Sequence, residues 1–279
     1  MPELPEVETI RRALAPELAG RTFTGGWGHP SAKFVGAPDA VGTTVRTVGR
    51  RGKYLLVDLT ADGSDHPTGQ LVVHLGMSGV LALAPPTAAP SERRPTDRHV
   101  RAWWTLDDGR TLVFNDVRRF GRLAVVPYGE HRSLATLANL GPEPFDPRFT
   151  PQVLRDGIAA TSRTIKTALL SQRIVAGLGN IYADEALWRA GIDPRRRTGL
   201  GIERSVGLHR SIIDVLEEAL TQGGTTLRDY RTLDGSTGNN QHRLQVYGRG
   251  GSACLRCGAT LRTTVIDART TTWCVGCQR

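Results

Sequence analysis

Lysine is scarce in this chain, although the chain is strongly basic. Its 279 residues include 36 lysines and arginines against 27 acidic residues, a net charge of +9, yet the lysines are only Lys33, Lys53 and Lys166. This charge predicts an acidic partner, and nucleic acid is a better candidate than an anionic membrane surface. A generally basic surface is the alternative. Because arginine keeps its proton, a retained lysine such as Lys53 is a candidate for proton transfer.

Long apolar runs and a signal sequence are absent as well. No stretch is long and apolar enough to cross a membrane. The acidic, proline-containing start lacks the basic region and apolar stretch of a signal peptide. We therefore expect a cytoplasmic protein with no membrane partner. The length favours two domains, and no extended apolar stripe is left over for a second copy, which favours a monomer.

Cysteine is confined to the C-terminal end of the chain. The cysteines form two pairs separated by sixteen residues, each pair with a two-residue spacer: Cys254, Cys257, Cys274 and Cys277. This spacing is typical of a zinc ribbon, in which four thiolates fill a tetrahedral site and leave no position open for chemistry. One structural Zn²⁺ is the predicted cofactor, and disulfides are the alternative. Segments 261–266 and 270–273 predict a hairpin with Arg269 near its tip, where it can meet a phosphate.

The N-terminus offers a nucleophile. Once the initiator methionine is removed, Pro2 presents a secondary amine with a pKa near ~8, so a useful fraction is neutral. Condensation of this amine with a sugar carbon gives an iminium, whose fixed charge acidifies the neighbouring carbon and favours elimination. Glu3 and Glu6 place two carboxylates beside it. The alternative is that this segment only begins a helix, because Pro5 suits a first turn and apolar residues recur at helical spacing over 5–18.

Apolar alternation predicts β-structure from the first helix to about residue 128. Segments 53–59 and 100–106 are examples, and Asp-Asp-Gly at 107–109 is a hairpin signal. The expected result is two packed antiparallel sheets. A segment rich in proline and charge, 85–98, predicts an exposed mobile loop within this domain.

Beyond a proline-rich hinge at 141–147, the apolar period changes from two to nearly four, which predicts a helical domain. The expected helices are 153–159, 165–172, 180–190 and 204–220. A glycine-rich turn precedes Asn180, which can cap the third helix, and the start of that helix can bind a phosphate. A plain capped helical hairpin is the alternative.

Several short segments recur in order along the chain. They are MPELPEVETIRR, RRGKYLL around residue 53, HLGMSG at 74–79, VRRFG at 117–121, GLGNIYADEALW at 177–188, GGTTLRDY at 223–230, VYGR at 246–249 and the cysteine pairs. This ordered set, over essentially the full length, resembles the formamidopyrimidine-DNA glycosylase and endonuclease VIII family of base-excision repair enzymes. The resemblance implies a partner, double-stranded DNA with oxidised or abasic nucleotides, met at the nucleoid of a bacterial-type cell.

An α+β multidomain fold follows from the patterns and the resemblance together. The expected parts are an N-terminal catalytic antiparallel β-sandwich with an N-terminal helix (1–130), a linker (131–150), a helical helix-two-turn-helix DNA-binding domain (151–240) and a C-terminal zinc-ribbon β-hairpin (241–279).

The implied activity is that of a bifunctional DNA glycosylase and AP lyase. Pro2 would attack the sugar C1′, Glu3 would transfer protons, and Glu6 would support the site or interact with the flipped nucleotide. Lys53 would serve elimination and hold a phosphate. Arg269 would hold a flanking phosphate and act in the last elimination. Successive β and δ eliminations would leave a one-nucleotide gap.

The family fills the space left by a flipped base with a methionine, an arginine and a phenylalanine, which match Met77, Arg118 and Phe120 here. The complete set favours oxidised purines, namely 8-oxoguanine and formamidopyrimidines. Core positions for Met77 and Phe120 are the alternative. Other functional hypotheses are an endonuclease VIII-like enzyme for oxidised pyrimidines and a non-catalytic zinc-finger DNA-binding protein. Further DNA contacts are expected from Asn180, His99, Arg163, Lys166 and Tyr247.

Two positions depart from the family pattern. The family commonly has an aromatic residue before Gln241 in the lesion-capping loop, where this chain has Asn239 and Asn240. We therefore expect a loop that is more mobile or caps the base differently. Of a His-x-His pair, only His99 is kept, with Asp97 at the earlier position, which puts one phosphate contact in doubt.

Overall fold

The computed structural model describes the chain except for residues 62–63, 65, 87–96, 198 and 227–237. Contacts among the described residues group them into two units. The first comprises Met1–Ala138 and Gly223–Gly238, and the second Asn139–Gln222 and Asn239–Arg279. The cysteine pairs thus fall in the same unit as the helices. The domain boundaries expected from the sequence stay a prediction.

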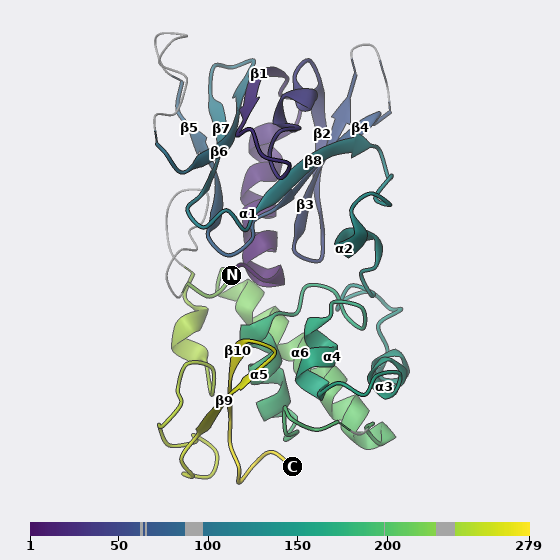
Figure 1. Ribbon diagram of the computed structural model, residues 1–279, viewed down its shortest axis with the longest axis vertical. Coiled ribbons are helices and arrows are strands. Elements are labelled where there is room, and N and C mark those ends of the chain that lie inside the picture. Colours follow the sequence, from purple (N-terminus) through teal and green to yellow (C-terminus); the bar gives the residue numbers. More distant parts are fainter. Residues whose placement is uncertain (62–63, 65, 87–96, 198, 227–237) are drawn as a thin grey trace. The chain divides into compact units, whose positions relative to one another are not determined.

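The first unit contains a long helix and two antiparallel sheets (Figure 1). Its elements are α1 (Leu4–Leu18), β1 (Phe23–Gly28), η1 (Ala37–Ala40), β2 (Thr44–Arg51), β3 (Tyr54–Thr60), β4 (Gly69–His74), β5 (Gly79–Ala84), β6 (Val100–Leu106), β7 (Thr111–Asp116), β8 (Arg122–Pro127) and α2 (Ala135–Ala138). The sheet orders are β1-β6-β7-β5 and β2-β3-β4-β8, which confirms the predicted two-sheet domain. Most of the predicted loop 85–98 lies outside the described residues.

One buried core joins α1 to both sheets. The apolar face of α1 contributes Val7, Ile10 and Leu14, which are fully or almost fully buried. Leu55 of one sheet and Trp104 of the other are fully buried in the same core. Since burial of each such side chain stabilises the fold by about 1.5–3 kcal/mol, the start of α1 is held firmly against the sheets.

The second unit is helical, with one hairpin. Its elements are α3 (Pro151–Ala159), α4 (Ile165–Leu170), α5 (Asn180–Arg189), α6 (Ile202–Thr221), η3 (Asn240–Arg243), β9 (Arg262–Ile266) and β10 (Arg269–Trp273). The four predicted helices are present, with bounds that differ by two residues at most. Thr150 and Thr164 cap α3 and α4 by accepting backbone N–H groups. None of the described helices is long and apolar enough to cross a bilayer.

The turn between α4 and α5 is held by Gln172. Its side-chain oxygen accepts the N–H of Gly177 at 2.9 Å, and its amide nitrogen donates to the carbonyl of Leu178. The predicted cap of α5 by Asn180 is wrong, because Gly179 is the capping position and Asn180 is the first helical residue. The amide of Asn180 is therefore directed to another partner, described below.

The predicted hairpin is confirmed as β9 and β10, with Ile266 opposite Arg269. The two turn residues, Asp267 and Ala268, have φ of 47° and 58°. Positive φ at both positions is the signature of a type I′ turn, whose twist matches that of the strands. This turn sets Arg269 at the first position of β10.

Candidate functional site

Pro2 and Glu3 lie buried directly before α1. The N–H of Glu3 donates to Glu6 Oε2 at 2.7 Å, which forms a capping box at the start of the helix. The other oxygen of Glu6, Oε1, accepts the N–H of Thr225 at 2.7 Å. Both carboxylate oxygens of Glu6 thus accept backbone N–H groups, one of them from Glu3, so Glu6 fixes the position of the N-terminal residues.

The segment that Glu6 meets at Thr225 leads into residues 227–237. A Cβ added at Gly224 would lie 2.9 Å from Glu6 Oε1, and Gly224 has a φ of +86°. Glycine is therefore required where this segment passes α1. Most of the capping loop lies outside the described residues, but Asn240, one of the departures from the family pattern, is buried in η3.

Lys53 is buried in the turn between β2 and β3. Arg50 fixes this turn, because its Nη1 donates to the carbonyl of Gly52 at 2.8 Å. The same guanidinium bonds to Glu8 of α1, with 3.1 Å between Arg50 Nε and Glu8 Oε2. The turn that carries Lys53 is thereby tied to α1.

Glu8 is the centre of a charge cluster on α1. Burial raises its pKa, but hydrogen bonds from Arg11 and Arg12 and the charges of Arg11 and Arg50 outweigh this effect and lower the pKa to about 2. Arg11 also donates to the carbonyl of Val48 at 3.2 Å. Arg11 contacts Val48, whereas Glu8, nearer the start of α1, contacts Arg50, nearer the end of β2. The first turn of α1 therefore points toward the turn that carries Lys53.

His74, at the end of β4, carries a neutral imidazole. Burial lowers its pKa to about 4, and the charges of Lys53 and Arg122 add to the effect. Its Nδ1 accepts the N–H of Gly76 at 3.1 Å, which leaves the proton on Nε2. The ring also packs on Tyr54, with 4.7 Å between centroids. His74 therefore offers a single N–H donor beside Lys53.

The predicted space-filling residues are on the surface of the first unit. Met77, in the loop between β4 and β5, is 38% exposed, and Phe120, in the loop between β7 and β8, is 53% exposed. Arg118 is exposed as well. The core alternative for Met77 and Phe120 is therefore wrong. Their exposure suits side chains that enter a DNA duplex.

A buried carboxylate joins these two loops. Asp116 accepts the Ser78 hydroxyl at 2.6 Å with one oxygen and the N–H of Gly121 at 2.7 Å with the other. Ser78 in turn accepts the N–H of Arg118 at 3.0 Å. A Cβ added at Gly76 would lie 2.3 Å from the Gly121 nitrogen, so the loops touch through their backbones. Met77, Arg118 and Phe120 are thus presented as one surface.

Lys166 is fully buried in the second unit. Its ammonium lies 2.6 Å from Asp184 Oδ1 and donates to the Thr271 hydroxyl at 2.8 Å and the Thr270 carbonyl at 3.2 Å. Asp184 Oδ2 accepts the N–H of Thr272 at 3.0 Å. The pair docks β10 onto the helices, so the position of Lys166 does not support the predicted direct contact with DNA. Burial raises the pKa of Asp184 to about 6 despite the charge of Lys166.

Asn180 binds the residue that follows Arg269 in β10. The amide of Asn180 donates to the carbonyl of Thr270 at 3.0 Å, and Thr270 directly follows the exposed Arg269. A primary amide has two donor hydrogens, so the same group can serve the hairpin and a phosphate. The structure therefore brings these two predicted phosphate contacts together.

The remaining predicted DNA contacts are scattered. Arg163 is exposed just before α4. His99 is half-buried, and its backbone N–H donates to Asp97 Oδ1 at 2.8 Å. Tyr247 is half-buried, and its N–H donates to Glu185 at 2.8 Å. Asp97, which departs from the family pattern, therefore orders the backbone at His99.

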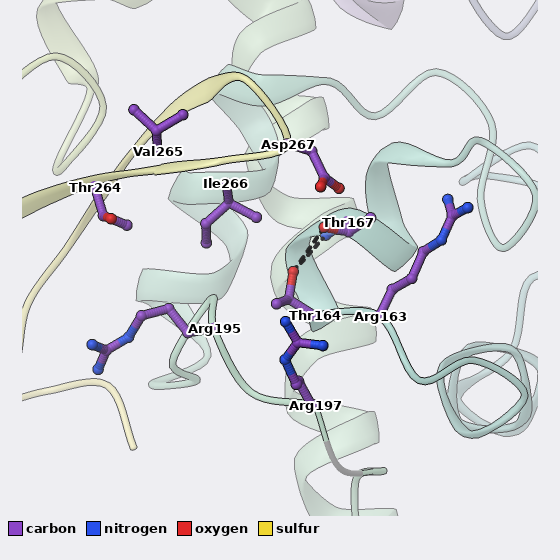
Figure 2. A pocket seen from close by; sticks show the side chains of 9 residues that line it. All are labelled: Arg163, Thr164, Thr167, Arg195, Arg197, Thr264, Val265, Ile266 and Asp267. Carbon is purple, nitrogen blue, oxygen red and sulfur yellow. Dashed lines mark hydrogen bonds between the residues drawn. The ribbon is translucent and has the colours of Figure 1, made fainter.

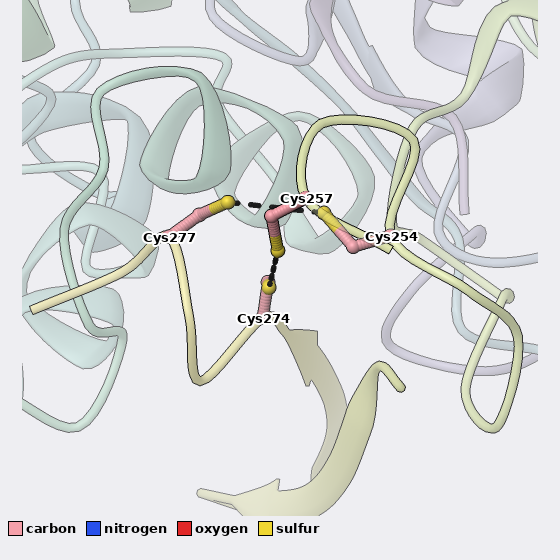
Figure 3. A group of neighbouring side chains, drawn as sticks. All are labelled: Cys254, Cys257, Cys274 and Cys277. Carbon is pink, nitrogen blue, oxygen red and sulfur yellow. Dashed lines mark hydrogen bonds between the residues drawn. The ribbon is translucent and has the colours of Figure 1, made fainter. Parts of the chain in front are cut away.

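The four cysteines converge on one point (Figure 3). Their sulfur atoms lie within 4.8 Å of one another, with 3.9 Å between Cys254 and Cys277 and 3.4 Å between Cys257 and Cys274. All four are free thiols, so the disulfide alternative is wrong. Zn–S bonds of about 2.3 Å in a tetrahedron place sulfur atoms about 3.8 Å apart. The cluster fits a structural zinc that holds the base of the hairpin.

Comparison with known proteins assigns the family. Residues 1–123 match the formamidopyrimidine-DNA glycosylase N-terminal domain, and residues 140–231 match the formamidopyrimidine-DNA glycosylase H2TH domain. The formamidopyrimidine-DNA glycosylase of Alkalilimnicola ehrlichii is 44% identical over 100% of both chains. The chain belongs to the formamidopyrimidine-DNA glycosylase family.

Solved structures of this family share the fold. The crystal structure of MutM (Fpg) from Thermus thermophilus has a TM-score of 0.88 at 42% identity and covers 99% of this chain and 98% of that one. A Lactococcus lactis Fpg mutant bound to DNA containing Fapy-dG has a TM-score of 0.87 at 35% identity and covers both chains fully. The Lactococcus enzyme is also known with abasic-site DNA, at 33% identity, a TM-score of 0.85 and 99% of both chains. The family, the fold class and the zinc site expected from the sequence are confirmed.

Four residues that hold the site together structurally were not predicted from the sequence. They are His74, Asp116, and the pair formed by Glu8 and Arg50. A signal existed for His74, Glu8 and Arg50, since each lies inside a segment that carried the resemblance: HLGMSG, MPELPEVETIRR and RRGKYLL, respectively. Asp116 directly precedes VRRFG, but nothing local distinguishes it from a surface carboxylate.

Proposed function

We propose that the chain excises oxidised purines, 8-oxoguanine and formamidopyrimidines, from duplex DNA and then cleaves the strand, with Pro2 as the nucleophile. The carrying observation is the buried Pro2-Glu3 start of α1 in a chain that matches relatives over its full length. Relatives crystallised with Fapy-dG and abasic-site DNA support both halves of the activity. Base excision and strand cleavage would take place in the cytoplasm, at the nucleoid.

The first step joins enzyme and DNA. With Met1 removed, the lone pair of the Pro2 nitrogen forms a bond to C1′ of the damaged nucleotide. The bond from C1′ to the base breaks, its electron pair leaves with the base, and the base takes up the proton that the Pro2 nitrogen loses. Glu3 delivers a proton to the ring oxygen as the sugar opens, and the product is a Pro2 iminium.

Strand cleavage follows from the charge of that iminium. Loss of a proton from C2′ expels the 3′ phosphate, which is the β elimination. Loss of a proton from C4′ then expels the 5′ phosphate, which is the δ elimination. Lys53, buried in the turn next to the start of α1, serves proton transfer and phosphate binding, and Arg269 assists the last step.

Base extrusion requires that the resulting space be filled. Met77 and Phe120 supply the apolar surface, and Arg118 supplies hydrogen bonds to the orphaned cytosine. Asn180 and Arg269 hold phosphates beside the flipped nucleotide. The neutral His74 is a further donor for the same backbone, because its Nδ1 accepts the N–H of Gly76 and its proton is therefore on Nε2.

Borohydride trapping on 8-oxoguanine DNA tests the nucleophile. The mature protein should become covalently attached, and Pro2→Gly should lower the yield at least about 100-fold, because the attacking secondary amine is gone. Pro16→Gly, a change in an exposed position of the same helix, is the matched control and should trap normally. Intact mass shows whether Met1 has been removed.

Three outcomes would count against the proposal. Full trapping by a form with a non-cleavable extension before Pro2 would rule out the terminal amine. Faster excision of dihydrouracil or thymine glycol than of 8-oxoguanine opposite cytosine would move the chain to the pyrimidine branch. Binding to abasic DNA without any strand break would support the non-catalytic zinc-finger alternative.

A further inference from the structure

A basic cavity of about 650 Å³ opens in the second unit beside the hairpin (Figure 2). Its walls come from the start of α4, the loop after α5 and strand β9. The residues that matter here are Arg163, Thr164, Arg195, Arg197, Thr264 and Asp267. In Figure 2, Arg197 reaches toward Thr164, with Arg163 and Arg195 on either side. Of these residues, only Arg163 is among the DNA contacts expected from the sequence.

Positive charge dominates its lining. Three guanidinium groups face one carboxylate, that of Asp267. Arg195 is matched by Asp193, with 2.6 Å between Nη2 and Oδ2, and it packs over the ring of Trp273. Arg163 and Arg197 are exposed and form no ion pair within the described part of the chain. One net positive charge therefore remains after Asp193 and Asp267 are counted.

Backbone carbonyl groups of the loop after α5 occupy the first N–H groups of α4. The N–H of Ile165 donates to the carbonyl of Arg196 at 2.7 Å, and that of Lys166 donates to the carbonyl of Pro194 at 3.3 Å. These bonds fasten the loop after α5 onto the start of α4, which sets Arg197 beside Arg163. An anion here would thus be bound by guanidinium and hydroxyl groups, which suit phosphate oxygens.

We propose that this cavity binds a backbone phosphate of the DNA, at a second position away from the damaged nucleotide. The inference rests on the proposed function, because it takes duplex DNA as the ligand. The cavity and Arg269 share one hairpin: Ile266 in the cavity wall pairs with Arg269, and Asp267 begins the turn. Since each strand carries a phosphate every ~3.4 Å of helix axis, a duplex held by Arg269 offers further phosphates to the neighbouring surface.

The salt dependence of DNA binding tests the proposal. We would measure Kd for a duplex with a tetrahydrofuran abasic analogue at several salt concentrations, with wild type and Arg163→Gln/Arg197→Gln. Loss of one phosphate contact should lower the slope of log K against log salt by about 0.9 and weaken binding whatever the lesion. The matched control is Arg148→Gln/Arg210→Gln, which removes two arginines of the same unit whose side chains are 83% exposed.

A slope equal to that of the control would overturn the proposal. Loss of inorganic phosphate binding, with an unchanged DNA slope, would assign the cavity to a free anion and overturn it as well. Wild-type protein that fails to trap, but keeps the slope difference, would sink the proposed function and leave the phosphate site standing.

Discussion

In each unit, charged side chains link a β-hairpin to a helix, but the two sets of contacts differ. The first links the β2–β3 hairpin to α1, and the second links the β9–β10 hairpin to α4 and α5. In the first unit, Glu8 is half-buried and shares its charge among Arg11, Arg12 and Arg50, which holds the turn of Lys53. In the second unit, Lys166 and Asp184 are fully buried and have each other as ionic partners, and they hold β10 next to Arg269.

The difference predicts how much stability each group of charged residues loses when one member is substituted. Arg11 and Arg12 are the more exposed arginines around Glu8, so water and the remaining arginines take over when one of them is lost, and each contributes little alone. A buried pair has no such reserve, because removal of one partner leaves a charge in a medium that solvates it poorly. The presentation of Arg269 should therefore depend on both members of the buried pair, whereas that of Lys53 should survive the loss of Arg11 or Arg12.

Lys166→Met should have the largest effect on stability. The change leaves Asp184 without its ammonium, and we expect the free energy of unfolding to fall by about 3–5 kcal/mol. Arg12→Met, in the cluster of the first unit, is the matched control and should cost less than about 1 kcal/mol. Urea denaturation, with the zinc content of each variant measured in parallel, provides the comparison.

A second variant separates charge from packing at this pair. Lys166→Met/Asp184→Leu removes both charges, so it should recover most of the stability that the single change loses. A single variant as stable as Arg12→Met would contradict the contrast between the units. Loss of zinc from both variants alike would mean that hairpin docking, rather than the buried charge, sets the stability.

Asp116→Asn should affect catalysis more than stability. Asp116 binds the two loops that carry Met77 and Phe120 by hydrogen bonds rather than by an ion pair. Because a hydrogen bond to a charged group contributes about 1.5–3 kcal/mol, loosening the loops should slow excision of 8-oxoguanine roughly 10-fold or more. Asp97→Asn, an exposed carboxylate beside the same sheet, is the control.

A comparison of two DNA substrates shows whether Asp116→Asn disturbs only the two loops or the whole first unit. A preformed abasic site needs no base release, so single-turnover cleavage of abasic DNA by Asp116→Asn should stay within about threefold of wild type. Equal losses on both substrates would show that Asp116 supports the whole unit and not the two loops.

The elements with a strong local signal were predictable from the sequence. Apolar spacing predicted α1 and the four helices α3 to α6 within two residues, and the cysteine spacing predicted the zinc cluster. The buried networks were not predictable, because their partners are distant in the chain: Ser78 and Asp116 are 38 residues apart, and Lys166 and Thr271 are 105 apart. A charged residue that finds such a partner carries no periodic signature.

Two residues have partners that the sequence did not indicate, for the same reason. Lys166 was expected to contact DNA, and its burial against Asp184 indicates another role. Asn180 looked like a cap because asparagine commonly caps helices. The helix begins at Asn180, as expected, but Gly179 takes the cap position and the carbonyl of Thr270 accepts the Asn180 amide.

The smallest and most specific contrast concerns pH. The pKa of Glu8 is lowered from 4.5 to about 2, so its contribution to stability is present above pH 4.5 and is lost as the pH falls toward 2. The pKa of Asp184 is raised from 3.8 to about 6, so the folded state holds this proton more tightly than the unfolded chain. Its contribution is therefore greatest below about pH 4 and declines as the pH rises through 6.

Difference curves isolate these two groups. We would measure the free energy of unfolding between pH 2.5 and 7 for wild type, Glu8→Gln and Asp184→Asn. The difference between wild type and Glu8→Gln should rise with pH at the acid end, and that between wild type and Asp184→Asn should fall between about pH 4 and 6. If both curves rise, the attraction of Lys166 exceeds the effect of burial, and the two sets of contacts obey the same electrostatics despite their different surroundings.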